Sequence, residues 1–148
     1  MAKQTYKDFM ESIKESKHSN INLDKAKPAA RKTADKIRRD GLLPDISPAN
    51  FTRITNAIED AILSAVHDNT RVPIRKEAKE VYDEIFGTIH FKQNKDLRIK
   101  AAGDRLVFLL KDRGDVPQDL DDTSTINMGI HIHKAMRAVV EEILGRKL

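Results

Sequence analysis

The sequence has no cysteine and no tryptophan, and its 148 residues include only six glycines and five prolines. The absence of cysteine excludes a disulfide framework, a thiolate zinc site and a catalytic cysteine. Charged residues interrupt every long apolar stretch, so we expect no membrane span and no membrane partner. Lys3, Lys7, Asp8 and Glu11 interrupt any apolar segment of a signal peptide. We therefore expect a cytoplasmic protein.

The positive charge of the chain is concentrated near its N-terminus. Residues 1–43 carry 11 basic and 6 acidic side chains, a net charge of +5, whereas residues 44–148 carry 16 basic and 17 acidic ones, a net charge of −1. Leu, Ile, Val and Phe account for 7 of the first 43 residues and for 31 of the remaining 105. A segment so poor in apolar side chains cannot build a core alone. It must dock on the rest of the chain, on another subunit or on a ligand.

Apolar residues recur at helical spacing along most of the chain, which predicts an all-α fold. Five or six helices would form one bundle-like domain, with residues 44–148 as the helical body and residues 1–43 as a basic N-terminal arm of one or two short helices. The pattern predicts helices over residues 3–16, 24–40, 48–67, 73–87, 94–113 and 134–146. Residues 17–23 would form a connection, and the acidic segment 115–122 a solvated loop.

Capping residues locate several of these helix ends. Ser47 followed by Pro48 is a strong helix start, because Ser accepts from a free backbone amide and Pro needs no donor there. Asp24 and Gly41 would cap the second helix, Gly114 would follow the fifth, and residues 67–69 would end the third.

Two segments leave the choice between helix and strand open. Gly103 weakens a helix over 94–113, and residues 97–110 would alternatively form a hairpin. Residues 125–133 alternate polar and apolar side chains, as a strand does, yet they also fit the first turns of a long helix. We favour helix for both, with a small hairpin or strand within 89–133, and hence an α+β fold, as the alternative.

Histidine and aspartate residues suggest weak metal-site candidates. His131 and His133 would share one face of a strand but diverge on a helix, so only a strand would let both bind one metal ion. His67 and Asp68 resemble a ligand pair of metal-dependent phosphohydrolases of the HD type, with His18 and Asp112 or Asp115 as further ligands. A two-residue pattern is frequent by chance, and no phosphate loop or nucleophile motif accompanies it. We therefore expect no cofactor and no enzymatic activity.

A dense basic cluster provides the best candidate site. Seven cations lie within 15 residues, opposed by Asp35 alone: Lys25, Lys27, Arg31, Lys32, Lys36, Arg38 and Arg39. On a helix, Lys25, Lys32, Lys36 and Arg39 would lie along one side, with Arg31 and Arg38 near its edge. Such a surface binds the phosphates of nucleic acid by releasing counterions. The alternatives are an acidic protein partner, the chain's own acidic loop, or a surface that only improves solubility.

We therefore expect a small, non-enzymatic accessory or regulatory protein that binds DNA or RNA through the basic cluster. The alternative is an inhibitor, adaptor or assembly module that binds a protein through its helical surface. The apolar face of the C-terminal helix, with Met136, Val139 and Val140, would make a homodimer possible. A phosphohydrolase-like enzyme using His67, Asp68, His131 and His133 is the third hypothesis.

Overall fold

The computed structural model describes residues 22–43 and 46–148. In these residues it contains helices and no strand, so the all-α prediction is confirmed and the α+β alternative is wrong. The helix predicted over residues 3–16 lies outside the described residues, as does most of the connection 17–23. A 3-10 turn, η2 (Leu23–Lys25), precedes five helices: α2 (Ala26–Arg39), α3 (Pro48–Thr70), α4 (Lys76–Ile85), α5 (Lys95–Asp112) and α6 (Asp122–Leu144).

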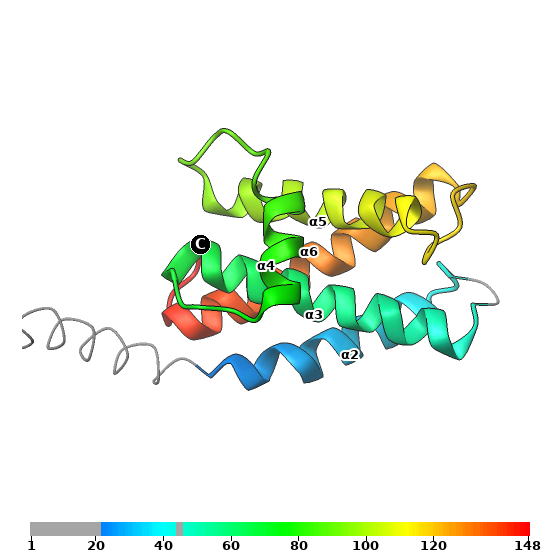
Figure 1. The fold of residues 1–148 in the computed structure, drawn as a ribbon, viewed down its shortest axis with the longest axis horizontal. Helices are drawn as coiled ribbons and strands as arrows, with labels where there is room; N and C mark the ends of the chain where they lie inside the picture. Colours follow the sequence, from blue (N-terminus) through cyan, green and yellow to red (C-terminus); the bar gives the residue numbers. More distant parts are fainter. Residues whose placement is uncertain (1–21, 44–45) are drawn as a thin grey trace, which may run out of the picture.

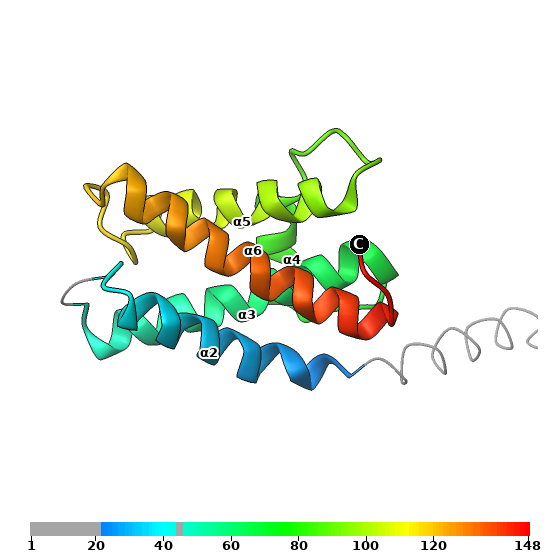
Figure 2. The same ribbon diagram turned by 180° about the vertical axis from the view of Figure 1, so that it is seen from behind.

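Four long helices, α2, α3, α5 and α6, run along the length of the molecule, and the short α4 crosses them (Figure 1). Helix α3 lies at the centre, because it contacts each of the other four helices. From behind, α6 runs diagonally between α5 and the pair formed by α2 and α3 (Figure 2). None of the described helices is both long and apolar enough to cross a membrane.

Helix α2 docks on α3 and α6 through the thin apolar stripe that the sequence shows. Ala26, Ala30, Ala34 and Ile37 are 0–1% exposed and belong to the main core. Burying an isoleucine side chain contributes about 1.5–3 kcal/mol, while the alanines let the helices approach closely. The sequence allowed three partners for the basic segment: the rest of the chain, another subunit or a ligand. Helix α2 of this segment docks on the rest of the same chain.

Helix α3 begins as predicted, since Ser47 accepts a hydrogen bond from the amide of Asn50 at 3.1 Å and Pro48 is the first helical residue. It does not end at residues 67–69, as the sequence suggested. The side chains of Asp68 and Asn69 do not cap the helix: Asp68 binds Arg98, and Asn69 donates to the carbonyl of Ala65. The helix therefore continues to Thr70.

The two segments for which the sequence allowed helix or strand are both helical and belong to α5 and α6. Residues 95–112 form one helix, so the hairpin alternative is wrong, and residues 123–133 are the first turns of α6. The two helices pack closely at Gly103 and Gly129, where a Cβ atom added to Gly103 would be in van der Waals contact with the carbonyl oxygen of Gly129, at 3.4 Å. Helix α6 thus begins at Asp122 instead of residue 134.

Three smaller differences concern helix ends and the acidic loop. The predicted helix 73–87 extends only over Lys76–Ile85. Asn22, not Asp24, caps the start of the second helical segment, where it accepts from the amide of Asp24. Asp115 and Val116 are buried, so the segment 115–122 is only partly solvated; Gly114, in a left-handed conformation, turns the chain inward here.

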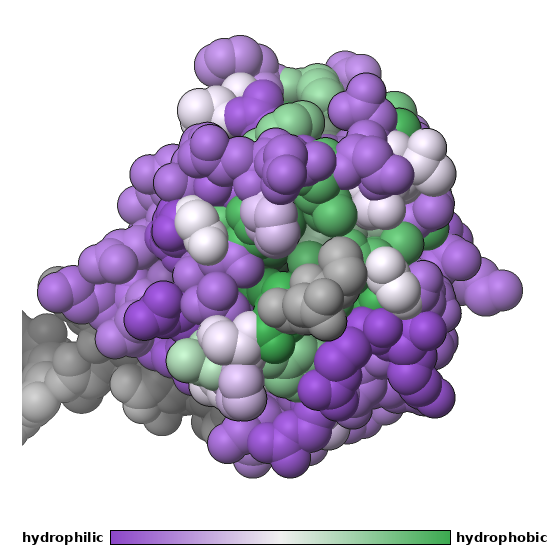
Figure 3. Space-filling model, turned by 90° about the vertical axis from the view of Figure 1, so that its right-hand side faces the viewer, coloured by the Kyte–Doolittle hydropathy of each residue, from purple (hydrophilic) through white to green (hydrophobic). Residues whose placement is uncertain are grey.

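Hydrophobic side chains also gather on one end of the molecule, surrounded by hydrophilic ones (Figure 3). This is the end at which α2 connects to α3 and α5 connects to α6. Leu42, Leu43 and Val116, from these two connections, are buried. The connections therefore close this end of the core.

Candidate nucleic-acid interface

The basic cluster lies on the side of α2 that faces away from the core. All of its cations except the half-buried Lys25 are exposed. The last turn of α2 holds Lys36, Arg38 and Arg39, which also stabilise the negative end of the helix dipole. The same helix therefore has an apolar stripe against the bundle and a cationic surface toward solvent.

Helices α2 and α6 run antiparallel, and one ion pair and one hydrogen bond between side chains join them. Lys25, at the start of α2, pairs with Glu142 near the end of α6. Asp40, just after α2, accepts from the Nε2 atom of His131 at 2.9 Å. Figure 2 shows the two helices running in opposite directions, with the start of α2 close to the end of α6.

A groove of about 580 Å³ lies between the two helices. Lys25, Lys32 and Lys36 of α2 line it together with His131, Lys134 and Glu142 of α6. Its remaining lining is apolar or small: Pro28, Ala29, Thr33, Ala135, Ala138 and Val139.

A second, shallower concavity of about 410 Å³ lies on the outer side of α2. It is lined by Lys27, Pro28, Arg31, Lys32, Asp35 and Arg39, and we call it the outer face. Pro28 and Lys32 belong to both concavities. The structure therefore divides the predicted basic cluster between two adjoining surfaces.

Arg38 differs from the other cations of the cluster. Its guanidinium lies 3.3 Å from Asp35 and 4.2 Å from the centroid of the Phe51 ring, so it packs on α3. In the described part of the chain, Lys27, Arg31, Lys32, Lys36 and Arg39 have no carboxylate within ion-pair distance. The acidic loop does not neutralise them either, since Asp115 pairs with Arg53 instead.

Sequence reasoning did not place Lys134, a further cation, or His131 beside the basic cluster, although both line the groove. They are far from α2 in the chain and follow no local pattern that would connect them with it. Only the antiparallel packing of α6 on α2 brings them to the groove.

The histidines of α6 do not converge. His131 points toward Asp40, whereas the Nε2 atom of His133 lies 2.8 Å from Asp96 at the start of α5. No cluster of three or more His, Asp or Glu side chains suited to a metal ion occurs in residues 22–43 and 46–148. His18, a further ligand in the phosphohydrolase hypothesis, lies outside these residues.

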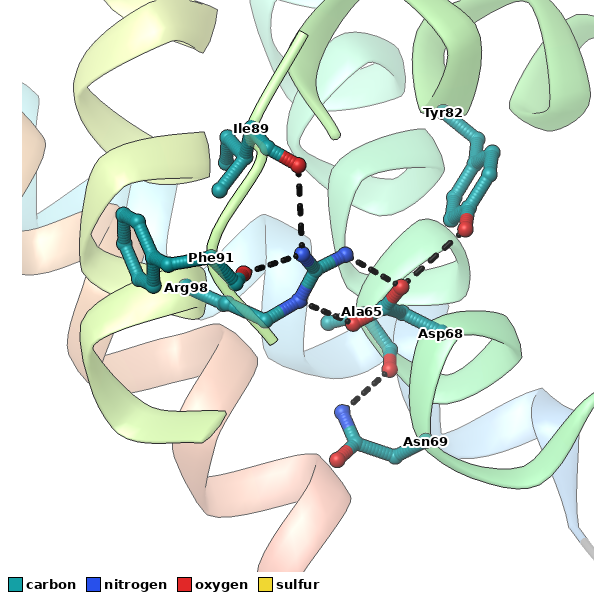
Figure 4. A network of polar contacts seen from close by, with 7 residues as sticks. All are labelled: Ala65, Asp68, Asn69, Tyr82, Ile89, Phe91 and Arg98. Carbon is teal, nitrogen blue, oxygen red and sulfur yellow. Dashed lines mark hydrogen bonds and ion pairs between the residues drawn. The ribbon is translucent and has the colours of Figure 1, made fainter. Parts of the chain in front are cut away.

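The side chains of His67 and Asp68 also bind different groups of the fold. His67 binds the carbonyl of Val72 through Nδ1 at 2.7 Å. Asp68 is buried and accepts two hydrogen bonds from Arg98, at 2.8 and 3.0 Å, and one from the hydroxyl of Tyr82 (Figure 4). Asp68 and Arg98 thus form a bidentate ion pair that joins α3 to α5.

Arg98 also binds the connection between α4 and α5. It donates to the carbonyls of Phe91 at 2.7 Å and Ile89 at 3.4 Å (Figure 4). The hydrogen bond to Asp68 raises the pKa of Arg98 above its ordinary value. Because every polar group in this network has a partner within the fold, the network positions α3, α4 and α5 relative to one another.

No family model, curated protein or solved structure matches this chain.

Proposed function

We propose that this protein is a nucleic-acid-binding accessory protein that contacts the phosphates of a duplex through the outer face of α2 and the adjoining Lys36. The observation that carries the proposal is the set of cations without carboxylate partners in the described chain: Lys27, Arg31, Lys32, Lys36 and Arg39. A rigid helix holds them, because the opposite side of α2 is buried in the core. Phosphates that replace bound counterions at such a surface supply affinity without sequence specificity.

The proposal favours duplexes over single strands. Residues 25–39 contain no aromatic side chain, and the nearby Phe51 is covered by Arg38. Binding of single strands relies on aromatic rings that stack on the bases. Phosphate contacts without stacking suit the regular backbone of a double helix.

A titration of the full chain with duplex DNA at several salt concentrations tests this function. Five phosphate contacts predict a slope of about −4.5 for log K against log salt concentration. The triple variant Lys27→Ala, Arg31→Ala, Arg39→Ala should reduce the steepness of that slope by about 2.7, since each contact contributes about 0.9. Circular dichroism would confirm that the variant is folded.

The matched control removes three exposed cations that line neither concavity: Lys76→Ala, Lys92→Ala, Lys100→Ala. Both triple variants have the same net charge, so only the position of the lost charge differs. Equal losses in the two variants, or no binding at low salt, would contradict the proposal.

A further inference from the structure

We propose that the groove between α2 and α6 is a docking site for a partner protein, and that its ligand is an amphipathic helix with carboxylates along both edges. The residues that line this groove differ from those of the outer face, except for Pro28 and Lys32, which line both concavities.

The shape of the groove suits a helix. The part of α2 that lines it, from Lys25 to Lys36, is about 17 Å long at a rise of about 1.5 Å per residue, which corresponds to about three helical turns. The lining between the two rims consists largely of small side chains, including Ala29, Ala135 and Ala138. Small residues allow a third helix to approach at the interaxial distance of about 8–10 Å that is usual for packed helices.

The charges of the groove select the partner. Lys32 and Lys36 stand on the α2 rim and Lys134 on the α6 rim, and in the described chain none of them has a carboxylate partner. Glu142, which lines the groove, is already paired with Lys25, and the His131 side chain is hydrogen-bonded to Asp40 outside it. A ligand with acidic side chains on both edges would complete the charge pairs on both rims, and its apolar stripe would cover the alanines between them.

The lining argues for this ligand and against nucleic acid in the groove. A nucleic-acid backbone has no apolar stripe to cover Ala135, Ala138 and Val139, and the lining has no aromatic ring for base stacking. An acidic amphipathic helix would pair its carboxylates with the lysines of both rims and cover the apolar lining between them.

The test uses the full chain and a fluorescein-labelled synthetic helix of about 18 residues, long enough to be helical in water. Its leucines follow the spacing i, i+3, i+4, i+7, and glutamates flank them on both sides. A second peptide has serine in place of leucine and keeps every glutamate. Fluorescence anisotropy should show saturable binding of the leucine peptide and at least about tenfold weaker binding of the serine peptide.

Ala138→Trp fills the groove without changing the charge, because Ala138 is exposed on α6. It should weaken binding of the leucine peptide at least about tenfold and leave duplex DNA binding unchanged. Ala49→Trp adds the same bulk at an exposed position on α3 that lines neither concavity, and it should change neither binding constant.

Several results would overturn the inference. Equal affinity for both peptides would show charge attraction without a groove, and unaltered peptide binding by Ala138→Trp would place the peptide elsewhere. Competition between DNA and the peptide, with both weakened by Ala138→Trp, would make the groove part of the nucleic-acid surface. A dimer that dissociates in Ala138→Trp would identify a second copy as the occupant. Failure to bind DNA would contradict only the proposed function.

Discussion

At the scale of single residues, the ionisation of Tyr82 is coupled to folding. Its hydroxyl donates to Asp68 at 3.0 Å, its ring stacks on Phe86, and His67 meets it edge-on. Burial raises the pKa of Tyr82 above its ordinary value of 10.0, and the negative charge of Asp68 raises it further. The folded protein therefore retains this proton at a pH where the unfolded chain has begun to release it.

This difference predicts that the free energy of unfolding decreases as the pH rises through 10 and beyond, toward the folded-state pKa of Tyr82. Tyr82→Phe should remove this part of the pH dependence. At neutral pH it should cost about 1 kcal/mol, because the hydrogen bond to Asp68 is lost. Urea denaturation at a series of pH values, followed by circular dichroism, measures both effects.

The same variant can be checked by absorbance. The chain has only two tyrosines and no tryptophan, so the spectral change on tyrosine ionisation is easy to follow. A parallel loss of stability above pH 10 in the wild type and in Tyr82→Phe would contradict the role assigned to this hydroxyl.

At the scale of elements, α5 and α6 cross close to two glycines, Gly103 and Gly129. Gly103 lies inside α5, where a glycine costs about 1 kcal/mol relative to alanine. Its added Cβ atom would meet the Gly129 carbonyl and the backbone of His133 at 3.4 Å, which is ordinary van der Waals contact. The packing therefore has room for a methyl group at Gly103.

We predict that Gly103→Ala increases the free energy of unfolding by about 0.5–1 kcal/mol. Gly87→Ala provides the contrast, because its Cβ atom would lie 2.3 Å from the carbonyl oxygen of Asp83 and the backbone would have to shift. Chemical denaturation of both variants should move the midpoint in opposite directions. Destabilisation by Gly103→Ala would show that α5 and α6 pack more tightly than the structure indicates.

The elements also show what the sequence could and could not predict. Ser47 and Pro48 identify the start of α3 because capping is local chemistry. Asp68 and Asn69 resemble a helix end, but Asp68 is drawn inward by Arg98, whose position follows only from the tertiary fold. The alternation within residues 125–133 suits a strand or a helix. In the helix that forms, Met128 and Ile132 are buried in the core.

The candidate site, too, could be predicted only in part from the sequence. The cations of α2 are evident because they are consecutive in the chain, and the alanine stripe indicates which side of the helix is buried. The division of the cluster into two surfaces was not predictable. It depends on the packing of α6, which brings Lys134 to the groove beside α2, and on the contact between Arg38 and the Phe51 ring of α3.

At the scale of the whole molecule, α2 belongs to the same core as the rest of the described chain. Ile37 is fully buried, and the α2 stripe contacts both α3 and α6. The basic surface is therefore attached to a rigid body and not to an independent appendage. Its cations keep their spacing only while the core is intact.

We predict that Ile37→Ala reduces the free energy of unfolding by about 2–5 kcal/mol, the usual cost of a cavity left by a large aliphatic side chain. Arg31→Ala, on the exposed side of the same helix, should change it by no more than about 0.5 kcal/mol. Circular dichroism with urea measures both. If Ile37→Ala left the unfolding midpoint unchanged, α2 would not be part of the cooperative unit.

The antiparallel packing of α2 and α6 also determines how the molecule responds to force. Helix α2 begins and α6 ends at the same end of the bundle (Figure 2), where Lys25 pairs with Glu142. Tension applied between these two points would peel the helices apart one turn at a time instead of shearing them along their length. The Lys25–Glu142 pair would open first and the Asp40–His131 pair last, and a ligand in the groove would resist the peeling from its first turn.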